Sequence, residues 1–125
     1  MRWLPDRRAQ SNDVAERLTP RGLFRVDRDS ASLSDRGTVQ TWLRELHQDS
    51  RQQVFIHRPW GTIVADTDRQ HPVTVILFDG EKSWVATAPG AGERQALTPE
   101  QVEHIMLDAL TADSRPQWPD WHYLI

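Results

Sequence analysis

The chain has 125 residues, of which 38% are hydrophobic and 26% are charged, and it contains no cysteine. This length suits a single domain with its own core, and the lack of cysteine excludes disulfides, thiolate catalysis and thiolate metal sites. The formal net charge of -3 argues against a general nucleic-acid or anionic-membrane binder, because such proteins need concentrated positive charge.

The charge is unevenly distributed, with seven Arg and four acidic residues in positions 1–28 and an acidic remainder. A contact between this basic segment and the acidic body of the same chain is the simplest explanation. Residues 1–12 show no periodic pattern, which predicts an extended N-terminal segment without the apolar run of a secretory signal. No window reaches the roughly 20 apolar residues of a membrane span, so we expect a cytoplasmic protein.

In the first part of the chain, Asp13 with Glu16 three residues later predicts a short capped helix that ends before Pro20. Residues 23–26 predict a brief edge strand, and residues 30–37 predict a polar loop. Four apolar residues then recur at the spacing of one helical face: Val39, Trp42, Leu43 and Leu46. They predict an amphipathic helix that buries this face.

Four successive strands are predicted next, at residues 53–57, 62–66, 73–78 and 83–88. Arg58-Pro59-Trp60-Gly61 predicts the turn of the first pair, and Asp79-Gly80 predicts the turn of the second pair. The loop of the second pair has either two residues, Asp79-Gly80, or four, Asp79 to Lys82, and both lengths give the same parity. Successive strands pair most simply as an antiparallel meander. Alternation places five side chains of the second pair on one face, which we expect to be core: Val73, Val75, Leu77, Trp84 and Ala86.

The other face of the hairpin at residues 73–88 is too apolar for a strand pair that is simply open to water. It carries Ile76, Phe78 and Val85, together with three hydroxyl residues, Thr74, Ser83 and Thr87. Some cover is therefore predicted for this face. Two covers stay open, the C-terminal tail of the chain and a partner protein, and the tail is the favoured one.

Thr98-Pro99-Glu100-Gln101 predicts a helix start, because it combines a hydroxyl cap, a proline at the first helical position and a glutamine three residues after the cap. An apolar stripe follows, formed by Val102, Ile105, Met106, Ala109 and Leu110. We expect the hairpin face with Val75 and Trp84 to cover it. The tail, residues 115–125, has two prolines and two tryptophans, which predicts an extended segment packed on the body or an edge strand.

These elements together predict one α+β domain over residues 1–125. We expect a two-layer fold in which two main helices pack on one face of an antiparallel sheet. The sheet is a four-stranded meander, and it reaches five or six strands if the weaker segments also pair.

Five histidines and many carboxylates raise the question of a metal or acid–base site, but their spacing contains no ligand pair. His57 and Asp66 could meet across neighbouring strands, and Asp66 with Asp68 could bind a cation. A strand end that faces solvent explains these residues more simply. The sequence therefore predicts no catalytic residue, no metal and no cofactor.

The turn His57-Arg58-Pro59-Trp60 is unusual, because it combines two potentially cationic side chains with an indole that could stack on a base or anchor a protein partner. The alternative, which we favour, is that Trp60 folds back onto the edge of the sheet. The candidate partner contacts are Trp60, Arg58, Asp66, Asp68, Glu81 and Glu93.

Four pieces of the chain follow one another in a suggestive order: Gly37 to Leu46, Val73 to Phe78 with Asp79-Gly80, Leu97 to Leu110, and Arg115-Pro116 with Trp118 or Trp121. In this order they resemble the small α+β immunity proteins of bacterial polymorphic toxin systems that are often encoded beside deaminase toxins. The basic N-terminal segment and the tail beyond Trp118 depart from that pattern. The resemblance implies a non-catalytic protein that binds a cognate toxin and covers or distorts its active site.

The toxin implied by this resemblance is a nucleic-acid deaminase or another toxin that acts on nucleic acids. An acidic body could complement its basic substrate channel, whereas direct binding of nucleic acid or membrane is not expected. Two alternatives are a phage- or plasmid-derived enzyme inhibitor and a secretion chaperone. A third is a small hydrolase-type enzyme that uses His57 or His71 with Asp66.

Overall fold

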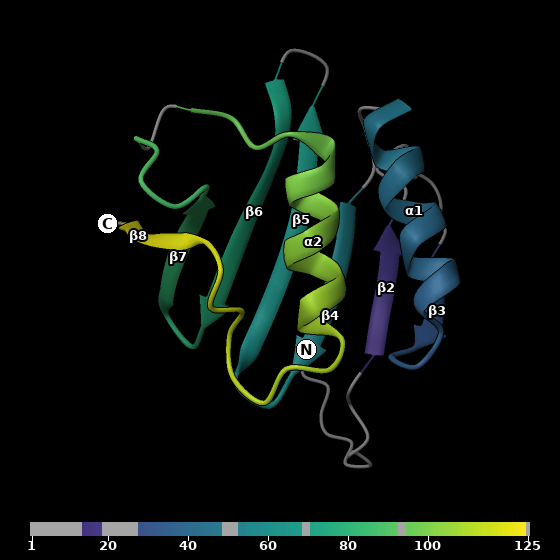
Figure 1. Cartoon of the computed structure of the whole chain (residues 1–125). Coiled ribbons are helices and arrows are strands. Elements are labelled where there is room, and N and C mark those ends of the chain that lie inside the picture. The colour runs from purple at the N-terminus through teal and green to yellow at the C-terminus, as the bar shows by residue number, and fades with distance from the viewer. Residues whose placement is uncertain (1–13, 19–27, 49–52, 69–70, 93–94, 125) are drawn as a thin grey trace.

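The computed structural model describes residues 14–18, 28–48, 53–68, 71–92 and 95–124. These residues form an α+β fold with one seven-stranded antiparallel sheet, in the order β3-β2-β4-β5-β6-β7-β8, and two helices (Figure 1). The strands are β2 (Val14–Leu18), β3 (Arg28–Ser32), β4 (Gln53–Arg58), β5 (Gly61–Asp68), β6 (His71–Asp79), β7 (Lys82–Thr87) and β8 (Asp120–Leu124). The helices are α1 (Arg36–Gln48) and α2 (Pro99–Ala109).

Both helices lie in front of the sheet in Figure 1, and each contacts β4, β5 and β6. We call the face that they cover the helix-covered face, and the other one the opposite face. The apolar stripe of α1 is buried as predicted, at Val39, Trp42, Leu43 and Leu46. It packs with Val54, Ile56, Ile63 and Val75 of the sheet and with Val102, Ile105 and Met106 of α2. No helix of the described residues is long and apolar enough to cross a membrane.

The hairpin of β6 and β7 keeps the predicted parity, because Leu77 is paired with Trp84 and both therefore lie on the same face of the sheet. The strands pair as far as Asp79 and Lys82, so its loop is Gly80-Glu81, one residue later than the Asp79-Gly80 loop. Gly80 has a φ of 64°, as a type II′ turn requires at its first central position. Since this loop keeps the predicted parity, the assignment of side chains to the two faces is confirmed.

Trp84 is only half-buried, which corrects its assignment to the core. The helices make their main contacts with β4 to β6, and of β7 it is Ala86, not Trp84, that belongs to the buried core. The indole of Trp84 instead lies beside Tyr123, with a centroid distance of 5.6 Å, and under the guanidinium of Arg115 at 5.5 Å. Trp84 therefore belongs to an aromatic cluster at the margin of the core.

The short helix predicted from Asp13 is wrong, because Val14–Leu18 is strand β2. One helical turn forms few hydrogen bonds for the residues it fixes, whereas β2 pairs with β3 on one side and with β4 on the other. Residues 28–32, expected to belong largely to a loop, form β3. The predicted strand at 23–26 and the extended segment at 1–12 lie outside the described residues.

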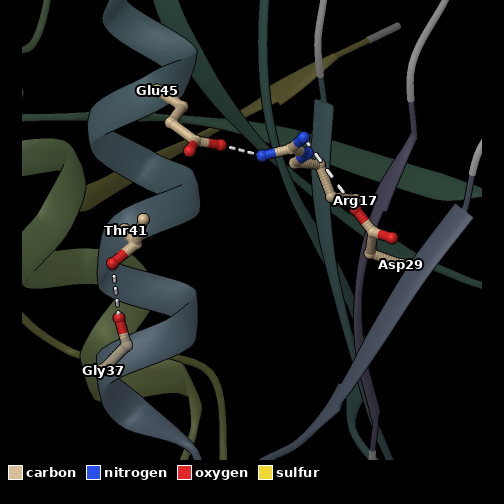
Figure 2. Close-up of polar contacts among 5 residues, drawn as sticks. All are labelled: Arg17, Asp29, Gly37, Thr41 and Glu45. Atoms are coloured by element: carbon tan, nitrogen blue, oxygen red, sulfur yellow. Dashed lines mark hydrogen bonds and ion pairs between the residues drawn. The ribbon is translucent and has the colours of Figure 1, made fainter.

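Arg17 ties these additional strands to the helical side of the molecule. It lies opposite Val54 of β4 and so faces α1, where its guanidinium forms an ion pair with Glu45 (Figure 2). Its other terminal nitrogen lies 3.8 Å from a carboxylate oxygen of Asp29 in β3. One arginine thus links β2, β3 and α1. Within α1, Thr41 donates a hydrogen bond of 3.0 Å to the carbonyl of Gly37.

The start of α2 agrees with the prediction. Thr98 is the cap residue, its Oγ1 accepts a hydrogen bond from the backbone N–H of Gln101 at 3.1 Å, and Gln101 Oε1 accepts one from the N–H of Thr98 at 2.9 Å. Two N–H groups that the helix itself leaves unpaired are thereby satisfied.

The tail returns to the sheet as β8, which pairs with β7 from Ser83 and Leu124 to Thr87 and Asp120. It is thus an edge strand, the second of the two predicted alternatives. Trp121 donates from Nε1 to the carbonyl of Pro116 at 3.0 Å, which fixes the approach to β8. Because β8 lies beside β7 in the sheet, the expectation that the tail lies over the opposite face is wrong.

Candidate protein-binding face

Four apolar side chains gather on the opposite face of β6, β7 and β8. The register places Phe78 beside Ser83 and Ser83 beside Leu124, and places Ile76 beside Val85 in the neighbouring row. Directly paired residues share a face, so these side chains all project away from the helices. We call Ile76, Phe78, Val85 and Leu124 the apolar patch.

The apolar patch is accessible to solvent. Phe78 has 44% of its surface exposed and Leu124 has 40%, while Ile76 and Val85 are half-buried. By contrast, Val64 on the same face, opposite Ile76 in β5, is only 4% exposed. With strands about 4.8 Å apart, the patch extends about 10 Å across the sheet. Adjoining exposed apolar groups of this kind are typical of surfaces that bind other molecules.

A polar array lies on the same face, across β2, β4 and β5. Thr62 is paired with His57, and the hydroxyl of Thr62 lies 3.1 Å from Nδ1 of the imidazole. The other ring nitrogen, Nε2, lies 3.5 Å from a carboxylate oxygen of Glu16. Phe55 stacks beside the imidazole, with a centroid distance of 6.1 Å.

This array has the order of a nucleophile, a base and an acid, but it also has a structural explanation. The three polar residues come from three neighbouring strands, and their contacts join these strands on the face away from the helices. Glu16 could not be found by sequence reasoning, because its segment carried the spacing of a helical cap. Asp66, the acid expected near His57, is four residues along β5 from Thr62, a separation of about 13 Å.

Arg58 and Trp60, expected as partner contacts, bind the chain itself. The guanidinium of Arg58 donates to the carbonyl of Leu110 at 2.5 Å, and the indole N–H of Trp60 donates to the carbonyl of Ala112 at 3.0 Å. Both carbonyls lie just after α2, where the helix no longer supplies N–H groups to pair with backbone carbonyls. The turn of β4 and β5 thus holds the end of α2. Trp60 folds back onto the chain itself, but it contacts the segment after α2 and not, as was favoured, the edge of the sheet.

The four acidic candidates are not brought together where the structure describes them. Asp66 is half-buried and paired with Thr74 near the start of β6, whereas Glu81 is exposed in the turn at the other end of β6. Five residues of strand, about 17 Å, separate Thr74 from that end. Asp68 ends β5, and both its side chain and Glu93 lie outside the described residues.

Comparisons of the chain with protein-family models, with curated proteins and with solved structures gave no match. The site must therefore be interpreted from its own chemistry. In the described parts of the chain, no three His, Asp or Glu side chains lie close enough together to hold a metal ion.

His47 has a shifted pKa, and it lies away from the apolar patch. Burial at the end of α1 lowers the pKa of His47 below its usual value, and the carboxylates of Glu100 and Glu103 oppose that shift. This group bears on stability and not on the chemistry of the opposite face.

Proposed function

We propose that this chain is a non-catalytic protein-binding module that binds and neutralises a cognate bacterial toxin. The observation that carries the proposal is the exposed apolar patch on the opposite face. Aromatic and aliphatic groups that are exposed side by side cost free energy in water, and this cost is relieved when a partner covers them. The choice of a toxin as that partner rests on the resemblance to immunity proteins.

The proposal includes an arrangement in which the sheet forms one layer and both helices form the other. In such an arrangement the opposite face is free for a partner, and the helices stabilise the sheet from behind. The proposal also places the protein in the cytoplasm, where it would meet the toxin before it acts on nucleic acid.

Co-expression tests the function directly. We expect a bacterial host that produces the product of the adjacent gene to stop growing, and to recover when this chain is produced as well. The two purified proteins should also elute together in size-exclusion chromatography. A toxic adjacent product that this chain neither binds nor neutralises would contradict the proposal. Binding without protection would favour a secretion chaperone, and inhibition of an enzyme that is not toxic would favour a phage- or plasmid-derived inhibitor.

A hydrolase-type enzyme is the second candidate, and the Thr62–His57–Glu16 array is the observation that favours it. His57→Ala removes the central imidazole, and His104→Ala is a matched control on the exposed surface of α2. For a binding module, both variants should protect the host as well as the wild type does. Loss of protection only in His57→Ala, with the complex still formed, would favour the enzyme.

A further inference from the structure

The charged side chains near the apolar patch are acidic. On the opposite face of β5 to β8, the structure describes the carboxylates of Asp66 and Asp120 and no Lys or Arg side chain. Glu81 is exposed at the tip of the turn that adjoins the patch. Lys82 is in β7, but alternation places it with Trp84 on the helix-covered face. The patch is therefore an apolar centre with acidic neighbours.

Three of the described arginines on the helix-covered side make contacts that fix them within the chain. Arg17 forms an ion pair with Glu45, Arg58 binds the end of α2, and Arg115 stacks on the indole of Trp84. These contacts engage the arginines within the chain itself. None of these three arginines lies beside the apolar patch, so the charges that the described residues of β5 to β8 offer on the opposite face are acidic.

The acidic residues around the apolar patch argue against a second copy of the chain as its occupant. A symmetric dimer through the opposite face would bring each patch against its own counterpart. Asp66, Asp120 and Glu81 of one copy would then approach the same residues of the other copy, and like charges disfavour such a contact. A basic partner gains from the same charges.

We propose that the apolar patch binds a partner protein through an apolar side chain of that partner which is surrounded by Lys and Arg. This inference rests on the proposed function and specifies the face and the chemistry of its contact. The partner's apolar group would lie against Phe78 and Leu124, and its cations would lie near Glu81, Asp66 and Asp120. A protein surface that binds nucleic acid carries the required positive charge.

The first test compares two aromatic residues on different faces, with the purified product of the adjacent gene as the probe. Phe78→Arg removes the exposed ring from the patch and adds a cation, while its aliphatic stem still covers neighbouring groups. Tyr123→Ser removes a ring that is 54% exposed on the helix-covered face. We expect Phe78→Arg to raise the Kd at least about 30-fold, the effect of a hot-spot residue, and Tyr123→Ser to change it less than about threefold.

The second test examines the charges through the association rate. Glu81→Lys reverses a charge beside the patch, and Asp108→Lys makes the same change on the exposed surface of α2. We expect Glu81→Lys to slow association about threefold or more at low salt, and more than Asp108→Lys does, with the difference shrinking at high salt. Equal effects of the two substitutions on the association rate would contradict the proposal that the partner's surface is basic.

Each remaining outcome also decides the proposal. If the wild type binds the probe and Phe78→Arg binds equally well, the face is wrong while the proposed function stands. If the wild type does not bind at all, the proposed function fails and this inference fails with it. A wild-type dimer in sedimentation velocity that Phe78→Arg dissociates would make a second copy the occupant. A fall in melting temperature above about 10 °C in Phe78→Arg would show that the ring is packed within the chain.

Discussion

Replacing Gly61 by alanine tests the packing directly behind the apolar patch. Gly61 has a φ of 147°, and a Cβ there would lie 2.7 Å from the carbonyl oxygen of Phe78 and 3.1 Å from Cδ1 of Leu77. The backbone conformation costs about 1–3 kcal/mol in a residue other than glycine, and forced repacking costs about 1–3 kcal/mol more. We therefore expect Gly61→Ala to lower the free energy of unfolding by about 2–6 kcal/mol.

Urea denaturation followed by tryptophan fluorescence measures this loss. A chain of this size has a free energy of unfolding of about 6–19 kcal/mol, so Gly61→Ala should still fold. The urea concentration at its unfolding midpoint should be lower than that of the wild type by about 1 M or more. Gly37→Ala is the matched control, because its Cβ meets nothing within 4 Å and Gly37 lies in the first turn of α1. That control should leave stability unchanged or raise it by up to about 1 kcal/mol. An unchanged midpoint in Gly61→Ala would refute the close approach of β5 and β6.

Thr98→Ala removes the cap of α2 and should lower the free energy of unfolding by about 1 kcal/mol, a loss that Thr98→Ser should largely avoid in the same urea assay. Trp60→Phe keeps a ring but loses the hydrogen bond to the carbonyl of Ala112, so a loss of about 1 kcal/mol is expected, and an unaltered midpoint would speak against that contact. Because burial lowers the pKa of His47 below 6.5, its protonation favours the unfolded chain, and its contribution to stability is lost as the pH falls below that value. As the pH falls from about 7.5 to about 5.5, His47→Gln should therefore gain stability relative to the wild type, by a small amount because His47 is only partly buried. A stability difference independent of pH would contradict this.

The elements that the sequence predicts well are those specified by neighbouring residues. Helix α2 begins at a cap, a proline and a glutamine within four positions, and α1 repeats its apolar residues over two turns. The hairpin of β6 and β7 follows from alternation and a glycine turn. Each of these signals lies within one element, so it is visible without knowledge of the fold.

The elements that were missed depend on distant pairing. Val14–Leu18 is too short to show a clear period, and it becomes a strand because β3 and β4 lie on either side of it. The same dependence hid the contact of Glu16 with His57, which lies in a strand, 41 positions later in the chain. The apolar character of the face with Phe78 was visible in the sequence, but its exposure depends on where β8 lies.

The pairing of β8 with β7 completes the apolar patch, because it brings Leu124 beside Ser83. Leu124 joins it from a position 41 residues beyond its neighbour Ser83, with α2 between them. Closing so long a loop has an entropic cost, which the contacts of β8 with β7 must offset. Without β8, β7 is the edge of the sheet and the patch lacks one of its two most exposed side chains. A partner that needs Leu124 would therefore distinguish finished molecules from partly folded ones.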